Sequence, residues 1–104
     1  MGIRVKKKGE YTVLTVDSRS LAGDEALELK KKALEIIDSG NIKISLDLIT
    51  PEYIDSSGVG KLLFLNKKLE KLEGEFSIIG INKTLFSFLD SLAITKVIKV
   101  VPPE

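Results

Sequence analysis

The residues best suited to a chemical event are two adjacent serines, Ser56 and Ser57, which follow Asp55 and precede Gly58. A serine hydroxyl can take up a phosphoryl group, which adds about −1.5 to −2 charges at neutral pH. A strand-like apolar run ends shortly before this segment, and a helix-period run over 59–72 follows it. We therefore expect the serines to lie where a loop enters a helix, next to free backbone N–H groups and the positive end of the helix dipole. This pattern favours a phosphorylation switch over a catalytic centre.

The same four residues also have a purely structural interpretation. Asp and Ser are frequent N-cap residues, and Gly is frequent in turns. Capping is, on local chemistry alone, the more common reason for an Asp-Ser-Ser-Gly segment at a helix start. The functional interpretation therefore depends on the elements that surround the segment.

The composition narrows the chemistry that the chain can perform. Its 104 residues suit one small domain, so we treat 1–104 as a single unit. The absence of Cys and His excludes disulfides, thiolate chemistry, a histidine general base and a Ser-His-Asp triad within the chain. The net charge of +1 does not indicate a nucleic-acid or anionic-membrane partner.

The hydropathy pattern bears on location. No apolar run reaches the ~18 residues that a membrane span needs, and the N-terminal residues lack the apolar core of a signal peptide. We therefore expect a cytoplasmic protein that neither inserts into a membrane nor binds nucleic acid directly.

A metal-dependent enzyme is an alternative from a different class of protein. Asp47, Glu52 and Asp55 could form a carboxylate cluster for Mg²⁺ beyond the end of a strand. No Gly-rich phosphate cradle or catalytic lysine accompanies them, and Gly58-Val59-Gly60 is too short for a dinucleotide fingerprint. We therefore expect no enzymatic activity, no catalytic residue, no cofactor and no metal.

The elements that must position the serines follow from hydrophobic periodicity. Alternating β-α-β units require a mostly parallel sheet with right-handed crossovers, so we predict an α/β fold with an N-terminal β-hairpin and about three major helices. Sites in such sheets lie beyond the carboxyl ends of strands, which is where the serine segment falls. The predicted elements are strands 3–6 and 11–16, helix 24–38, strand 42–48, helix 59–72, strand 75–81, helix 83–92 capped by Asn82, and strand 97–101.

One aromatic residue lies off the expected buried face of the 59–72 helix. Phe64 falls among lysines, and an apolar ring on a basic face can mark a partner site, although single exposed apolar residues are also common. We predict that Lys61, Phe64 and Lys68 bind a partner. The residues expected to face inward are Val59, Leu62, Leu63, Leu65, Leu69 and Leu72 in this helix and Leu85, Phe88, Leu89 and Leu92 in the next.

The sequence resembles the STAS family, the sulphate-transporter and anti-sigma factor antagonist domains, in element order over nearly its whole length. The eight-residue step from Asp47 to Asp55 also fits the family pattern. One departure is Ala93, which stands where the family often has Gly after the third helix. The matching segments are Asp47-Leu48, Ile54-Asp55-Ser56-Ser57-Gly58-Val59-Gly60, Asn82 and Leu92-Ala93-Ile94.

This resemblance implies roles for the residues of the segment. Ser57 is then the phosphoacceptor, Asp55, Ser56 and Gly58 shape its surroundings, and Asp47 lies beside them. The implied partner is a bacterial anti-sigma factor with serine kinase activity, which binds the unphosphorylated form and thereby frees its sigma factor to activate transcription. A serine phosphatase resets the cycle. Other STAS proteins serve in stressosomes, transporters or lipid-transport complexes, and an interaction module that is never phosphorylated remains the alternative.

Overall fold

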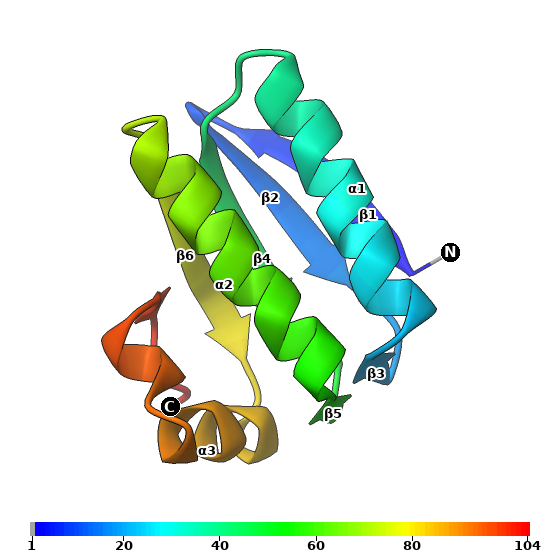
Figure 1. The fold of residues 1–104 in the computed structure, drawn as a ribbon. Coiled ribbons are helices and arrows are strands. Elements are labelled where there is room, and N and C mark those ends of the chain that lie inside the picture. Colours follow the sequence, from blue (N-terminus) through cyan, green and yellow to red (C-terminus); the bar gives the residue numbers. More distant parts are fainter. Residues whose placement is uncertain (1) are drawn as a thin grey trace.

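The computed structural model, which describes residues 2–104, has a main five-stranded sheet that helices cover on one face (Figure 1). The elements are β1 (Ile3–Lys8), β2 (Tyr11–Val16), β3 (Ser20–Leu21), α1 (Asp24–Asp38), β4 (Lys43–Leu48), β5 (Tyr53–Ile54), α2 (Ser56–Lys71), β6 (Glu75–Ile81), α3 (Lys83–Ser91), the short 3₁₀ helix η1 (Ile94–Lys96) and β7 (Lys99–Val100). The strand order across the main sheet is β1-β2-β4-β6-β7. Strand β1 is antiparallel to β2, and the other neighbours are parallel. The expected α/β fold, with its hairpin and three major helices, is confirmed.

Two short strands were not predicted from the sequence. Strands β3 and β5 pair in parallel as a separate two-stranded sheet, with Ser20 opposite Tyr53 and Leu21 opposite Ile54. Each strand has two residues, which is too short for an alternating pattern to be recognised. Their pairing matters because β3 leads into α1 and β5 leads into α2, so it places the first turns of these helices together (Figure 1).

The predicted start of the second helix is wrong by one turn. Helix α2 begins at Ser56 rather than Val59, so both serines belong to its first turn and not to a preceding loop. The last predicted strand is also shorter than expected. Ala93 adopts a left-handed conformation with φ 61°, η1 follows it, and only Lys99–Val100 remains as β7.

The hydrophobic core lies between one face of the sheet and helices α1 and α2, which cross it side by side (Figure 1). Three residues expected to face inward are exposed instead, namely Leu72, Phe88 and Leu92. Leu72 and Leu92 are the C-cap residues of α2 and α3, where the helical stripe has ended. Helix α3 lies at the end of the sheet, where Leu85 and Leu89 are its buried residues. The buried hydrophobic residues of the main sheet and of the two long helices are Leu14, Val16, Ile44, Leu46, Leu48, Phe76, Ile78, Ile81, Ala26, Leu29, Ala33, Ile37, Leu62, Leu65 and Leu69.

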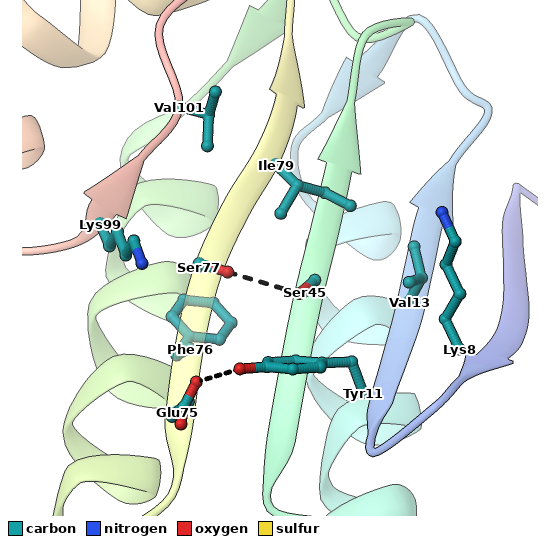
Figure 2. A pocket seen from close by; sticks show the side chains of 10 residues that line it. All are labelled: Lys8, Tyr11, Val13, Ser45, Glu75, Phe76, Ser77, Ile79, Lys99 and Val101. Atoms are coloured by element: carbon teal, nitrogen blue, oxygen red, sulfur yellow. Dashed lines mark hydrogen bonds between the residues drawn. The ribbon is translucent and has the colours of Figure 1, made fainter.

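Within the described residues 2–104, no helix covers the opposite face of the sheet, which is hollowed into a recess of about 680 Å³ (Figure 2). Tyr11 of β2 reaches across β4, and its hydroxyl donates a hydrogen bond of 2.6 Å to Oε1 of Glu75 on β6. The hydroxyls of Ser45 and Ser77 lie 3.4 Å apart on the floor of the recess. Because the serine segment starts a helix on the covered face, this recess is separate from it.

Candidate functional site

The serine segment is held by the carboxylate of Asp55, the N-cap residue of α2. Asp55 has an extended backbone, with φ −100° and ψ −179°, and its Oδ1 accepts a hydrogen bond of 2.7 Å from the backbone N–H of Gly58. An N-cap side chain satisfies one of the N–H groups that a helix start leaves unpaired. The structural interpretation of the segment therefore holds for Asp55, and it leaves the two serines free for another role.

Asp55 also reaches the start of the other long helix. Its Oδ2 accepts a hydrogen bond of 3.3 Å from the backbone N–H of Gly23, the N-cap residue of α1. Gly23 has φ 53° and no side chain that could cap α1. One carboxylate therefore serves the first turns of both helices. The sequence carried a weak signal of this arrangement, because a Gly stands where a helix start usually has Ser, Thr, Asn or Asp.

Gly58 allows α2 to approach β3 closely. A Cβ atom at this position would overlap the carbonyl oxygen of Leu21 and lie 2.5 Å from Cγ1 of Ile54. The first turn of α2 can therefore lie directly against the β3–β5 pair only because residue 58 has no side chain. This contact is a structural reason for a glycine at position 58.

The two serines differ in their surroundings. Ser57 is half-buried, and its Oγ accepts a hydrogen bond of 3.2 Å from Nζ of Lys61, one turn further along α2. Ser56 is exposed, and among residues 2–104 its side chain makes no hydrogen bond. The Lys61 contact was not part of the sequence analysis, although the spacing of four residues on a helix was its signal.

The electrostatic setting of Ser57 is positive. The backbone N–H groups of Ser56 and Ser57 point out of the first turn without an intrahelical acceptor, and the helix dipole adds a partial positive charge there. No acidic residue lies in the first turn of α2. The nearest carboxylate along the chain is Asp55, whose two oxygens already accept N–H groups. An anionic group on Ser57 would therefore meet more donors than acceptors.

Asp47 lies away from Ser57. It belongs to β4 and lines the uncovered face of the sheet together with Arg4, and its Oδ1 accepts a hydrogen bond of 3.1 Å from the backbone N–H of Ile49. Among residues 2–104, none of its hydrogen bonds reaches the serine segment. Asp47 thus contacts the start of the loop that runs from β4 to β5.

Asn82 holds the same loop from another side. Its Oδ1 accepts a hydrogen bond of 2.9 Å from the backbone N–H of Leu85, which confirms the predicted cap of α3. Its Nδ2 donates to the carbonyl oxygens of Ile49 at 2.9 Å and Pro51 at 2.6 Å. The second contact set could not be read from the sequence, because the amide meets a segment 31 to 33 residues earlier in the chain.

The predicted partner-binding residues share one face of α2 with Ser57. Positions 57, 61, 64 and 68 are separated by four, three and four residues, and at about 100° per residue they fall within about 60° of arc. We call Ser57, Lys61, Phe64 and Lys68 the α2 stripe. The ring of Phe64 is exposed, and Nζ of Lys30 on α1 lies 4.2 Å from its centroid. The stripe therefore combines a serine hydroxyl, an aromatic ring and two lysines on one surface, with Lys30 of α1 beside it.

The three carboxylates of the alternative Mg²⁺ site are not placed together. Within residues 2–104, no three His, Cys, Asp or Glu side chains are placed so that they could hold a metal ion, so Asp47, Glu52 and Asp55 form no such cluster. In the same part of the chain, no helix has the length and apolar character needed to cross a membrane.

Solved structures of similar fold include regulatory proteins and a transporter. The fold resembles that of TM1081 from Thermotoga maritima, a candidate anti-sigma factor antagonist, with a TM-score of 0.81 and 22% identity over 94% of this chain and 84% of that protein. It also resembles the Bacillus anti-sigma factor antagonist SpoIIAA in its unphosphorylated form, with a TM-score of 0.78 and 18% identity over 95% of this chain and 87% of SpoIIAA. The murine anion transporter Slc26a9 gives a TM-score of 0.73 and 16% identity over 95% of this chain but 17% of the transporter.

At these identities the structural likeness establishes the fold and not the activity. No curated protein sequence matches the chain significantly. The family described as "Mlab, STAS domain" matches residues 3–102, which is nearly the whole chain. The chain therefore belongs to the STAS domain family.

Proposed function

We propose that this chain is a bacterial anti-sigma factor antagonist whose partner binding is switched by phosphorylation of Ser57. In the unphosphorylated form it binds an anti-sigma factor with serine kinase activity and frees the sigma factor to activate transcription. The kinase phosphorylates Ser57, and a serine phosphatase removes the phosphate. The chain is then a substrate and a binding partner, without catalytic activity or a cofactor of its own.

The observation that supports this proposal most directly is the position of Ser57 at the head of the α2 stripe. The hydroxyl lies in the first turn of a capped helix, at the edge of a surface that carries Phe64 and Lys68. A partner that covers this stripe must also cover Ser57. The similar fold of SpoIIAA, an anti-sigma factor antagonist with solved unphosphorylated and phosphorylated forms, supports the general kind of function.

A phosphate can abolish such binding without changing the fold. Burying a charged group without full compensation costs several kcal/mol, and a loss of about 3 kcal/mol weakens binding more than a hundredfold. Within the free protein, the helix dipole and Lys61 attract the phosphate while Asp55 repels it. These opposing local effects leave the phosphorylated protein folded, so the charge acts at the interface.

A second candidate function is a STAS interaction module of a stressosome, transporter or lipid-transport complex that is never phosphorylated. The similarity to Slc26a9 favours this candidate, because there the matching region is a small part of a transporter. The two functions differ in one measurable property, since the second requires no covalent change at Ser57.

The phosphorylation state in the native host separates the two candidates. Tagged wild-type protein and the Ser57→Ala and Ser56→Ala variants would be purified from that host, and their intact masses and phosphopeptides measured. We expect a fraction of the wild-type and Ser56→Ala proteins to be heavier by one phosphate and Ser57→Ala to remain unmodified. Phosphate on Ser57→Ala but not on Ser56→Ala would show that the wrong serine was chosen.

Partner capture completes the test. The unphosphorylated wild-type protein should retain a serine kinase of the anti-sigma type from the host lysate, and the fraction phosphorylated at Ser57 should not. An unmodified protein under every growth and stress condition, bound to the same partner throughout, would contradict the proposal and favour the second candidate.

A further inference from the structure

Lys61 occupies a place that matters in both states of the proposed switch. It lies four residues after Ser57 on the same face of α2, and its Nζ already contacts the Ser57 hydroxyl at 3.2 Å. Side chains at this spacing on a helix are neighbours, and opposite charges there attract. Among residues 2–104, Lys61 takes part in no ion pair and in no hydrogen bond other than the one with Ser57.

We propose that Lys61 is the intramolecular counter-ion of phosphorylated Ser57. Phosphorylation then changes the α2 stripe in two ways, because it adds a dianion and also withdraws the Lys61 ammonium group from the partner. This inference rests on the phosphorylation of Ser57 proposed above and names the cation that pairs with the phosphate.

The geometry allows this pairing without a change of backbone. The phosphate oxygens extend beyond Oγ of Ser57, and the ammonium group of Lys61 is within hydrogen-bond distance of that atom before modification. Rotation of the flexible lysine side chain is sufficient to keep it against the phosphate. The free N–H groups of Ser56 and Ser57 face the same region and add donors at the helix start.

Other cations of this surface are engaged elsewhere or too distant. The Nζ of Lys30 lies over the ring of Phe64 at 4.2 Å, and Lys68 is about 16 Å further along the helix axis than Ser57 at about 1.5 Å per residue. Asp55 does not compete for Lys61, because its two carboxylate oxygens accept the N–H groups of Gly58 and Gly23. Lys61 is thus the cation that is placed to form an ion pair with a phosphate on Ser57.

The pairing has a measurable consequence for the phosphate itself. A neighbouring cation stabilises the dianion more than the monoanion, so it lowers the second pKa of phosphoserine, which is about 6 without such a neighbour. Removal of Lys61 should raise this pKa by about 0.2–0.4 unit, the effect expected for one charged pair on a helix.

Phosphoserine would be inserted at position 57 during translation, so that no kinase is needed, and its pKa followed by phosphorus NMR titration. The variants are Lys61→Met and Lys61→Gln, with Lys68→Met as the matched control on the same stripe and Lys61→Arg as the conservative replacement. We expect both neutral variants to raise the phosphate pKa, and Lys68→Met and Lys61→Arg to leave it at the wild-type value. Equal values in the wild-type protein and both neutral variants would overturn the inference, and so would a Lys68→Met shift as large as that of Lys61→Met.

This experiment fails separately from the proposed function. If the phosphoserine pKa of the wild-type protein equals that of both neutral Lys61 variants, and the host nevertheless phosphorylates Ser57, the role of Lys61 is overturned and the switch stays intact. A lowered pKa in a protein that the host never phosphorylates would show the pairing geometry but remove its regulatory role.

Discussion

An oxygen of the Asp55 carboxylate lies 3.3 Å from the backbone nitrogen of Gly23, 32 residues earlier in the chain. The other oxygen accepts from Gly58 at 2.7 Å, so a single side chain ties the first turn of α1 to the first turn of α2. Ser57 lies in the turn that is held in this way. The proposed phosphorylation site therefore lies in a helical turn that hydrogen bonds hold to the start of α1, and not in a loop.

Replacement of Asp55 should cost more stability than an ordinary surface substitution. We expect Asp55→Ala to lower the free energy of unfolding by about 1–2 kcal/mol, because it removes an N-cap and leaves the Gly23 N–H without its acceptor. Ser56→Ala, at the next residue, should change it by less than about 0.5 kcal/mol, since that side chain is exposed. Urea unfolding of the three proteins measures these differences, and equal midpoints for Asp55→Ala and the wild type would contradict the double role of Asp55.

The sequence predicted those elements whose signal is periodic. Helix α1 begins and ends at the predicted residues, and β6 also matches, because each carries a regular apolar pattern over several residues. Strands β3 and β5 have two residues each and gave no such pattern. The start of α2 was predicted three residues late, since Ser56 and Ser57 carry no apolar side chain, and only the N-cap contact of Asp55 marks it.

Replacement by alanine at the two glycines near the start of α2, Gly58 and Gly60, should change the stability of the protein in opposite directions. Gly58→Ala places a Cβ atom against the backbone of Leu21 and should destabilise the protein by about 1–3 kcal/mol. At Gly60 a Cβ atom meets nothing within 4 Å, so Gly60→Ala should stabilise the protein by about 0.5–1 kcal/mol through helix propensity. Thermal or urea unfolding compares the pair, and a shift of the same sign in both variants would show that the close approach to β3 is not what restricts residue 58.

Only those features of the candidate site that involve residues close together in the chain were predicted from the sequence. The roles of Asp55 as a cap and of Gly58 in shaping the turn follow from residue type and spacing. The contacts of Asp55 with Gly23 and of Asn82 with the β4–β5 loop join segments far apart in the chain, which no local pattern reveals. The position of Asp47 on the uncovered face of the sheet follows from strand alternation, whereas the family resemblance implied that Asp47 lies beside the serine segment.

The pair formed by Tyr11 and Glu75 on the uncovered face should be visible in an alkaline titration. The hydrogen bond from the Tyr11 hydroxyl to Glu75, together with the negative charge of that carboxylate, raises the pKa of the phenol above its ordinary value. Glu75→Gln removes the charge, so phenolate should form at lower pH. A Tyr53→Phe background leaves Tyr11 as the chain's single tyrosine, and its ultraviolet absorbance then reports the shift. An unchanged or higher pKa in Glu75→Gln would show that Glu75 is not its cause.

A fixed negative charge at position 57 should separate binding from folding. We expect Ser57→Asp to bind the kinase partner at least tenfold more weakly, while its circular dichroism and thermal unfolding remain close to those of the wild type, because an acidic side chain in the first turn of a helix is favourable by about 0.3–1 kcal/mol. Calorimetric titration with the partner measures the affinity. Wild-type affinity in this variant, or a global loss of structure, would contradict the charge mechanism.

Phe64 provides the sharpest test of the α2 stripe as a partner surface. Its side chain is 41% exposed and lies under Nζ of Lys30, so Phe64→Ala removes a cation–π contact worth about 0.5–1 kcal/mol and little buried core. A core phenylalanine would cost about 3–5 kcal/mol. We therefore expect a small loss of stability but a loss of partner affinity of about 2 kcal/mol or more, the effect of an aromatic residue at the centre of an interface.

Phe88 supplies a comparison, since this residue is similarly exposed at 42% but belongs to α3, where it lines a pocket with Tyr53 and Ile54 and not with residues of the stripe. Phe88→Ala should leave partner affinity near that of the wild type, and its unfolding should shift about as little as that of Phe64→Ala. Affinities would be measured on the folded fraction of each variant, so that unfolding is not mistaken for weak binding. A large drop in melting temperature for Phe64→Ala with intact affinity would show that the ring belongs to the core. Equal losses of affinity for Phe64→Ala and Phe88→Ala would show that the interface extends over α3 as well, and the α2 stripe would no longer define it.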